Sequence, residues 1–278
     1  MIIWLASYPK SGNTWVRSFL SAYYFSDDGI FNFNLLKNIN QYPHKKFFDK
    51  KIDKPGSIHE YWESSQKNIV TKKKPIILKT HNCLIPINGN NFTSLKYTLG
   101  VIYIVRDPRN IITSLKNHYE MSYDETLKFM INEKKFIFDN RDKGNYASFH
   151  FLSSWSNHYK SWIKSNLFKT LIIKYEDLEK KPYETFSNLI NFLNILMENE
   201  ESINEKKIIN CIETTSFEKL KKNEQKYGFK EAVYSNKTNG QIDFFNLGFK
   251  NKWKKILPKN LHKTVNETFK DDLIFFKY

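Results

Sequence analysis

The sequence predicts an α/β fold, a three-layer sandwich in which a central parallel β-sheet is flanked by helices. Short apolar segments alternate along the chain with longer segments of helical periodicity, which is typical of a parallel sheet covered on both faces. Of the 278 residues, 40% are hydrophobic, so the chain can bury a sizeable core. No internal repeat or low-complexity linker divides the sequence, and we expect a single domain over residues 1–278.

Four apolar segments have the length and composition of buried strands. They cover residues 2–6, 75–81, 100–105 and 171–175. Polar side chains stand at or just beyond the end of each segment, namely Lys10, His81, Arg106 and Tyr175. Ligands of open parallel sheets bind beyond the carboxyl ends of the strands. We therefore expect these four side chains to lie around one site.

The helices are predicted from apolar periodicity and from proline. The first helix is expected from Asn13, because apolar residues from Trp15 to Tyr23 recur at helical spacing. Pro108 can open a second helix over residues 108–119, since proline is well suited to the first turn. Further helices are expected over residues 124–138, 147–165, 182–196 and 258–270. The segments 27–74, 82–98 and 120–146 are expected to be loops with a few short helices.

The net charge of +15 comes mostly from lysine, since all but four of the 44 basic residues are lysines. Such a charge suits a polyanionic partner, which could be nucleic acid, an anionic membrane or a multiply phosphorylated small molecule. A compositional bias toward lysine, asparagine and isoleucine accounts for part of the charge equally well. The lysines are spread along the chain and no nucleic-acid-binding motif is visible, so we do not expect nucleic acid as a partner.

Composition also indicates the cellular compartment in which the protein works. No apolar run approaches the roughly 18 residues that suggest a membrane-spanning helix, so no integral membrane span is expected. Residues 1–9 lack the basic start of a secretory signal. Cys83 and Cys211 are too few for a disulfide scaffold or a cysteine-based zinc site. These features favour a cytoplasmic protein.

No metal site is expected, because the seven histidines show no metal-ligand spacing. His150 and His158 lie eight residues apart on a predicted helix, and we expect them to be surface or packing residues.

The first predicted turn has the composition of an anion-binding loop. Lys10, Ser11, Gly12 and Thr14 lie between a strand and a helix, where backbone N–H groups and the helix dipole favour negative charge. The spacing differs from the nucleotide P-loop G-x-x-x-x-G-K-[ST], because the first glycine is missing and the lysine precedes Gly12. The loop is therefore P-loop-like, and a magnesium-dependent phosphoryl transferase is disfavoured.

Residues 8–15 read YPKSGNTW, and this stretch closely resembles the 5′-phosphosulfate loop of the sulfotransferases, Y-P-K-S-G-T-T-W. These enzymes use 3′-phosphoadenosine 5′-phosphosulfate (PAPS) as the sulfuryl donor and release 3′-phosphoadenosine 5′-phosphate (PAP). Residues 101–114 resemble the family's 3′-phosphate motif, in which an arginine and a serine eight residues later hold that phosphate. Arg106 and Ser114 stand at those two positions.

Three shorter matches follow the family's order along the chain. Residues 79–81 resemble the strand-end K-T-H that carries the catalytic histidine, and residues 175–178 resemble Y-E-D-L/M. Residues 215–217 resemble, more weakly, the T-S-F near the adenine. Together the matches span residues 8 to about 254, so the chain resembles a cytosolic-type sulfotransferase over nearly its whole length.

The resemblance implies a transferase reaction and a set of site residues. His81 would be the general base, with Lys10 stabilising the leaving phosphate and Lys79 the transferring group. The residues implied to bind the nucleotide are Lys10, Ser11, Gly12, Asn13, Thr14, Trp15, Arg106, Ser114, Tyr175, Thr215, Ser216, Phe217 and Gly248. Trp15 would stack on the adenine. Members of the family need no metal.

The last motif of the family is altered in this chain. Sulfotransferases show R-K-G-x-x-G-D-W-K near the C-terminus, and here Gly248, Trp253 and Lys254 align with it. The Arg-Lys pair that would embrace the 3′-phosphate is replaced by Asn246 and Leu247. Residues 250 and 252, both lysines, are candidates to supply the missing charge.

The acceptor is not specified by the sequence. The predicted loops are rich in aromatic residues, which suit a small-molecule, lipid or glycan acceptor alike. Sulfation of a hydroxyl is favoured over sulfation of an amine, because an imidazole base suits hydroxyl deprotonation. The alternatives are a nucleotide-dependent phosphoryl transferase and a decayed relative that binds anions without turnover. The oligomeric state is not predicted.

Overall fold

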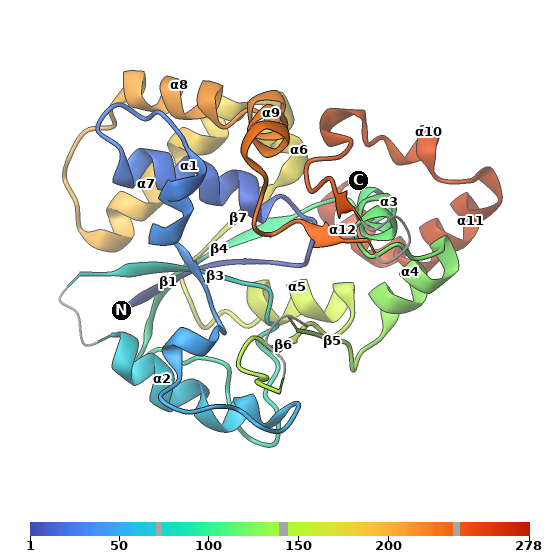
Figure 1. Ribbon diagram of the computed structural model, residues 1–278, viewed down its shortest axis with the longest axis horizontal. Helices are drawn as coiled ribbons and strands as arrows, with labels where there is room; N and C mark the ends of the chain where they lie inside the picture. The colour runs from blue at the N-terminus through green and yellow to red at the C-terminus, as the bar shows by residue number, and fades with distance from the viewer. Residues whose placement is uncertain (71–73, 139–143, 236–239) are drawn as a thin grey trace.

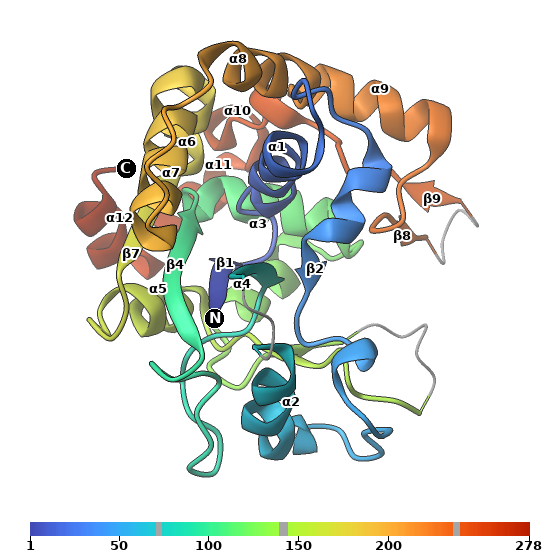
Figure 2. The same ribbon diagram turned by 90° about the vertical axis from the view of Figure 1, so that its left-hand side faces the viewer.

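A five-stranded parallel sheet forms the centre of the molecule. The computed structural model describes residues 1–70, 74–138, 144–235 and 240–278, and parts of the predicted loops 27–74 and 120–146 lie outside these ranges. The strand order is β2-β3-β1-β4-β7 (Figures 1 and 2). The strands are β1 (Ile2–Ser7), β2 (Asn40–Gln41), β3 (Ile76–Thr80), β4 (Thr98–Val105) and β7 (Thr170–Lys174).

The register brings the carboxyl ends of the strands to one edge of the sheet. Ala6 of β1 pairs with Thr80 of β3, and Ser7 pairs with Ile104 of β4. Val105 of β4 pairs in turn with Lys174 of β7. The four predicted strands are therefore confirmed. The two-residue β2 was not predicted, because it is a short polar segment inside a predicted loop.

Successive residues of the central strands alternate between the two faces of the sheet, as strand geometry requires. Ile3 and Leu5 belong to one core with Ile102 and Ile104, and Trp4 belongs to the other. The first face is covered by α1 (Asn13–Phe25), α7 (Pro182–Met197), α8 (Glu205–Thr214) and α9 (Phe217–Tyr227) (Figure 1). The predicted layers are confirmed.

The second face is covered by helices from the middle and the end of the chain. They are α2 (Trp62–Ile69), α3 (Pro108–His118), α4 (Tyr123–Ile131), α5 (Trp155–Ile163), α11 (Lys259–Thr268) and α12 (Lys270–Phe276). Two short helices, α6 (Tyr175–Lys180) and α10 (Trp253–Ile256), complete the described helices of α type. Short 3₁₀ turns cover 33–38, 45–47, 57–61 and 248–250.

Two helix predictions were wrong in extent. The helix expected over 124–138 ends at Ile131, and β5 (Phe136–Ile137) then pairs with β6 (His150–Phe151) in a separate antiparallel ribbon. The helix expected over 147–165 begins only at Trp155. Ser153 takes a left-handed backbone conformation with φ of 57°, and the Ser154 hydroxyl accepts a hydrogen bond from the Asn157 N–H as the N-cap. This cap starts the helix later than the apolar periodicity indicates.

The C-terminal third is more divided than the sequence predicts. The helix expected over 258–270 is α11, and a separate α12 follows it. A small ribbon of β8 (Val233–Tyr234) and β9 (Gln241–Ile242) lies between α9 and the C-terminal helices. None of the described helices is both long and apolar enough to cross a membrane.

Candidate functional site

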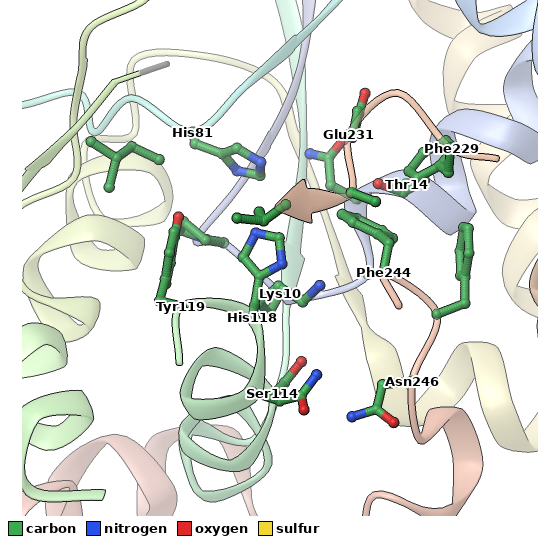
Figure 3. Close-up of a pocket in the computed structure, with 18 of the residues that line it drawn as sticks. Lys10, Thr14, His81, Ser114, His118, Tyr119, Phe229, Glu231, Phe244 and Asn246 are labelled. Atoms are coloured by element: carbon green, nitrogen blue, oxygen red, sulfur yellow. The ribbon is translucent and has the colours of Figure 1, made fainter. Parts of the chain in front are cut away.

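A cavity of about 1100 Å³ opens at the carboxyl ends of the central strands. The loop after β1, the end of β3 and the C-terminal half of α3 line it, together with residues 229–234 and 244–248. The residues Lys10, His81, Ser114, His118, Glu231 and Phe244 surround this space (Figure 3). The four strand-end side chains that the sequence singled out, Lys10, His81, Arg106 and Tyr175, all line it.

The loop between β1 and α1 depends on a glycine. Gly12 has φ of 103°, and a Cβ atom at this position would lie 2.6 Å from the Tyr175 ring. Lys10 also takes a left-handed conformation, with φ of 65°. A side chain at position 12 would therefore be strained and would clash. Glycine lets the loop turn sharply and bring its backbone to the cavity.

The N-terminus of α1 faces the cavity and carries no side-chain cap. Gly12 is the N-cap residue, no acidic residue lies in the first turn, and residues 12–15 line the cavity. The first N–H groups of a helix have no intrahelical acceptor, so they are available to an anion. The side-chain amide nitrogen of Asn13 is already engaged, because it donates to Leu5 O and to Ser7 Oγ, both at 3.1 Å.

Several buried polar atoms around this loop have no hydrogen-bond partner among the described residues, and they include Ser11 Oγ, Trp15 Nε1 and Arg106 Nε. Buried polar groups in proteins are normally hydrogen-bonded. Unsatisfied donors around an uncapped helix N-terminus fit a ligand with phosphate oxygens. The residues present therefore suit a phosphorylated nucleotide such as PAPS.

Lys10 and Arg106 bring positive charge to this end of the cavity. Arg106 donates from Nη1 to Lys10 O at 3.2 Å, and its guanidinium lies 3.8 Å from the centroid of the Tyr175 ring. The Lys10 ammonium lies 3.9 Å from the centroid of the Phe244 ring. Burial, together with the nearby Arg106 charge, lowers the pKa of Lys10 to about 7. An anion bound here would restore the charged form.

His81 lies at another part of the cavity wall and is held as a neutral ring. Its Nδ1–H donates to Ser7 O at 2.7 Å, which leaves Nε2 with a lone pair. Burial and the Lys79 charge lower the pKa of His81 well below its ordinary value, although the Ser7 hydrogen bond opposes this. A neutral imidazole of fixed orientation can accept a proton from a bound hydroxyl.

His150 and His158 pack around His81, and the expectation that they share a helix was wrong. His158 Nε2 donates to His81 O at 3.0 Å, and its Nδ1 accepts from the Tyr103 hydroxyl at 2.8 Å. His150 lies in β6, where its Nε2 accepts from the Gln41 amide at 2.9 Å. Its ring centroid is 6.2 Å from that of His81. Both rings are buried rather than at the surface.

Lys79 and Glu231 form an ion pair on the cavity wall. The Lys79 ammonium lies 2.9 Å from Glu231 Oε2, and Arg17 of α1 donates to Glu231 Oε1. Burial raises the pKa of Glu231, but Lys79 and Arg17 outweigh this and hold it well below the usual range. Glu224 of α9 accepts from the Phe244 and Phe245 N–H groups at 2.8 and 2.9 Å, which fixes the neighbouring stretch of the same wall.

The predicted nucleotide-binding residues are mostly brought together. Those that line the cavity are Lys10, Gly12, Asn13, Thr14, Trp15, Arg106, Ser114, Tyr175, Phe217 and Gly248. Three do not line it: Ser11 is a fully buried residue of the loop, Ser216 is the N-cap residue of α9, and the buried Thr215 hydroxyl donates to Cys211 O at 2.6 Å. For Thr215 the structure supports a local packing role.

The altered C-terminal motif also reaches the cavity. Asn246, Leu247, Gly248 and Asn251 line it, and Ser114 and Asn246 face each other across it (Figure 3). Gly248 packs closely on Phe217, since a Cβ atom there would lie 2.5 Å from that ring. Lys250 and Lys252 are not among the lining residues. Lys252 instead pairs with Glu179 at 3.1 Å.

Sequence reasoning missed His118, Glu231 and Phe244, which all line the cavity. Phe244 and Glu231 lie outside the recognised motifs, so no local pattern marked them. His118 stands four residues after Ser114, one turn along α3, and this helical spacing could have identified it. Among the described residues, no group of three or more His, Cys, Asp or Glu side chains could hold a metal ion.

A family model described as "Sulfotransferase domain" matches residues 2–276. Among characterised proteins, the chain is 25% identical to sulfotransferase 1A1 of Rattus norvegicus over 232 residues, which cover 79% of this chain and 66% of that protein. It is 26% identical to luciferin sulfotransferase of Photinus pyralis, over 79% of this chain and 56% of that protein. The chain therefore matches about two thirds or less of the length of these relatives.

Solved structures share the fold. Mouse sulfotransferase SULT7A1, crystallised with PAP, superposes with a TM-score of 0.59 at 19% identity and covers 98% of this chain and 84% of that one. Retinol dehydratase in complex with androsterone and PAP gives a TM-score of 0.60 at 17% identity, with 98% and 80% covered. The similarity extends over the sheet and both helical layers.

Proposed function

Because this chain belongs to the sulfotransferase domain family, we propose that it transfers a sulfuryl group from PAPS to an acceptor hydroxyl and releases PAP. One observation carries the proposal: a single cavity joins an uncapped helix N-terminus with Lys10 to a neutral, oriented His81. The first feature suits the phosphates of a nucleotide. The second suits an acceptor whose hydroxyl must lose a proton.

In this proposal the loop residues 10–15 hold the 5′-phosphosulfate, and α1 directs its N–H groups at it. The bound donor supplies the sulfuryl group, and the S–O bond to its 5′-phosphate breaks as the acceptor oxygen bonds to sulfur. Lys10 stabilises the charge that develops on the leaving phosphate. His81 Nε2 accepts the acceptor proton. Lys79 lies on the same wall and steadies the oxygens of the transferring group.

The 3′-phosphate is assigned to the end of the cavity near Ser114. Arg106 offers an unsatisfied Nε there, Ser114 a hydroxyl, and Asn246 a side-chain amide. Lys221 of α9 donates to Asn246 O at 3.0 Å, so a cation lies beside the position where relatives carry Arg-Lys. These groups would hold the 3′-phosphate in place of the missing Arg-Lys pair. Trp15 and Phe217 are proposed to pack on the adenine.

The acceptor is assigned to the part of the cavity that holds several apolar and aromatic side chains. Tyr119, Met121, Phe129 and Phe136 line it together with the base His81. We propose a small-molecule, lipid or glycan acceptor with a hydroxyl group, and hydroxyl over amine because His81 is held neutral. We also propose that residues 1–278 act as one domain and that the protein works in the cytoplasm, where the buried free thiols of Cys83 and Cys211 would stay reduced.

A turnover assay tests the proposal. PAP release from PAPS would be followed by chromatography with a mixed panel of phenols, alcohols, sugars and amines. We expect acceptor-dependent PAP release by the wild-type protein and a loss of at least about 100-fold in His81→Asn, since general-base catalysis contributes about this much. PAP affinity should stay within a few-fold of wild type. Equal turnover by His81→Asn would refute the base assignment.

A further inference from the structure

Glu231 is placed as an internal anion between two buried cations. Its two carboxylate oxygens are divided between Arg17 on α1 and Lys79 on β3. Arg17 and Lys79 are 7% and 4% exposed, whereas the Glu231 side chain is 27% exposed and lines the cavity (Figure 3). The ion pair therefore lies at the cavity wall and not inside the core.

The Arg17 side chain is held in place without Glu231, and the backbone of Lys79 is fixed by its strand. Arg17 donates from Nε to Ile39 O at 2.7 Å and from Nη2 to Leu36 O at 2.9 Å, so Nη1 is directed at the carboxylate. Lys79 belongs to a central strand, between neighbours β1 and β2. Glu231 stands in the connection between α9 and β8. A competing ligand would thus displace the carboxylate more easily than it would move either cation.

The local charge favours such a ligand. Arg17 and Lys79 share one carboxylate. Lys10 and Arg106 also line the cavity, and within the described ranges neither forms an ion pair with a carboxylate. Buried charge is costly unless it is paired. The guanidinium fork and the ammonium match two oxygens of a tetrahedral oxyanion as well as they match a carboxylate.

We propose that Arg17 and Lys79 form an oxyanion subsite for a sulfuryl or sulfate group, which Glu231 fills while the ligand is absent. The inference rests on the proposed function only for the source of that group, which is either the donor's sulfuryl end or free sulfate. Glu231 then acts as an internal competitor. It keeps both cations paired in the free protein and leaves when the ligand binds.

Sulfate binding tests the subsite without any nucleotide. Glu231→Gln removes the charge but keeps the shape, and Glu218→Gln on the exposed face of α9 is the matched control. Melting temperature would be measured against sodium sulfate, with sodium chloride at equal ionic strength. We expect the sulfate-induced rise of Glu231→Gln to saturate and to exceed the rise of wild type and Glu218→Gln by at least about 2 °C, since sulfate at the start of α1 and its general stabilising effect act on all three proteins alike. An equal response in all three proteins would overturn the proposal.

The test still gives a result if the Glu231→Gln variant folds poorly. If Glu231→Gln is unfolded in chloride, we expect sulfate to restore its circular dichroism spectrum. A chain that stays unfolded in both salts would assign Glu231 a structural role only and would overturn the subsite. The double variant Arg17→Leu, Glu231→Gln removes one cation as well, and we expect it to lose the additional sulfate response and to match wild type.

Nucleotide titrations distinguish the source of the group. Calorimetry would compare PAPS with PAP, which lacks the sulfuryl group, in wild type and in Glu231→Gln. If the donor uses the subsite, the ratio of PAPS to PAP affinity rises by about tenfold in the variant, as expected for one additional charge-assisted hydrogen bond to the sulfuryl oxygens. An unchanged ratio would exclude the donor as the source. If neither nucleotide binds, the proposed function fails, while the sulfate result still decides the subsite.

Discussion

At the scale of single residues, the site works through side chains whose protonation is set by their surroundings. His81 is neutral because it is buried beside the Lys79 charge, and its hydrogen bond to Ser7 O fixes which nitrogen carries the proton. Lys10 is buried beside Arg106, which makes its ammonium easy to deprotonate in the free protein. The charge of His81 and of Lys10 can therefore change when substrates bind.

The Lys10 environment predicts a pH dependence of nucleotide binding. Its pKa of about 7 means that the free protein loses this charge above neutral pH, whereas bound phosphate favours the charged form. The affinity for PAP should therefore fall by up to about 25-fold between pH 7.5 and 9. Calorimetric titration at both values measures it. Lys10→Arg, which keeps its charge, should show a flat response, and the same fall in that variant would contradict the assignment.

At the scale of elements, the strand–loop–helix unit at the start of the chain carries the proposed phosphate site. Its geometry was predictable, because every residue of the unit is close in sequence and the turn needs glycine. The boundaries of α4 and α5 were not, since apolar periodicity continued past Ile131 and began before Trp155. The caps at Ser122 and Ser154 decide where these helices start, and the chain then leaves helical geometry to form the β5–β6 ribbon.

Replacement of Gly12 tests the unit directly. Gly12→Ala should destabilise the fold by more than the roughly 1 kcal/mol that a left-handed alanine costs, because its Cβ would also clash with the Tyr175 ring 2.6 Å away. Gly56→Ala is the control, since Gly56 has a similar φ of 81° and no atom within 4 Å of the added Cβ. Urea unfolding would compare the two. Equal losses of stability would contradict the close packing of Tyr175.

At the scale of the whole molecule, two cores on opposite faces of one sheet meet at the cavity. Contacts between distant parts of the chain therefore could not be predicted from the sequence. The strands, the polar residues at their ends and the motif residues were predictable, because each depends on a short stretch of sequence. The contacts of Glu231 with Arg17 and Lys79 were not, because they join residues 214 and 152 positions apart. The clustering of His150 and His158 around His81 likewise depends on tertiary packing.

The buried histidines predict acid sensitivity of the whole fold. Burial lowers the pKa of His118 and His150 to about 3 and that of His158 to about 4, and it lowers the pKa of His81 as well. Below pH 6.5 the unfolded chain therefore binds more protons than the folded chain. The free energy of unfolding should fall as pH falls, by about 1 kcal/mol per histidine per pH unit.

Urea unfolding between pH 7 and 5.5 would measure this slope. His118→Phe removes the histidine that is not fully buried, and it should reduce the slope by about a quarter, since one of four groups is lost. A slope that is near zero in the wild-type protein would mean that these rings are not held neutral.

The central claim is that the cavity at the strand ends binds a 3′,5′-bisphosphorylated adenosine through Lys10, Arg106 and the start of α1. Isothermal titration of the protein with PAP, beside ATP and 5′-AMP and without magnesium, tests it most directly. We expect saturable micromolar binding of PAP, with ATP and 5′-AMP at least about tenfold weaker and Arg106→Ala weakened for PAP. Absence of PAP binding, or equal binding of ATP, would contradict the account.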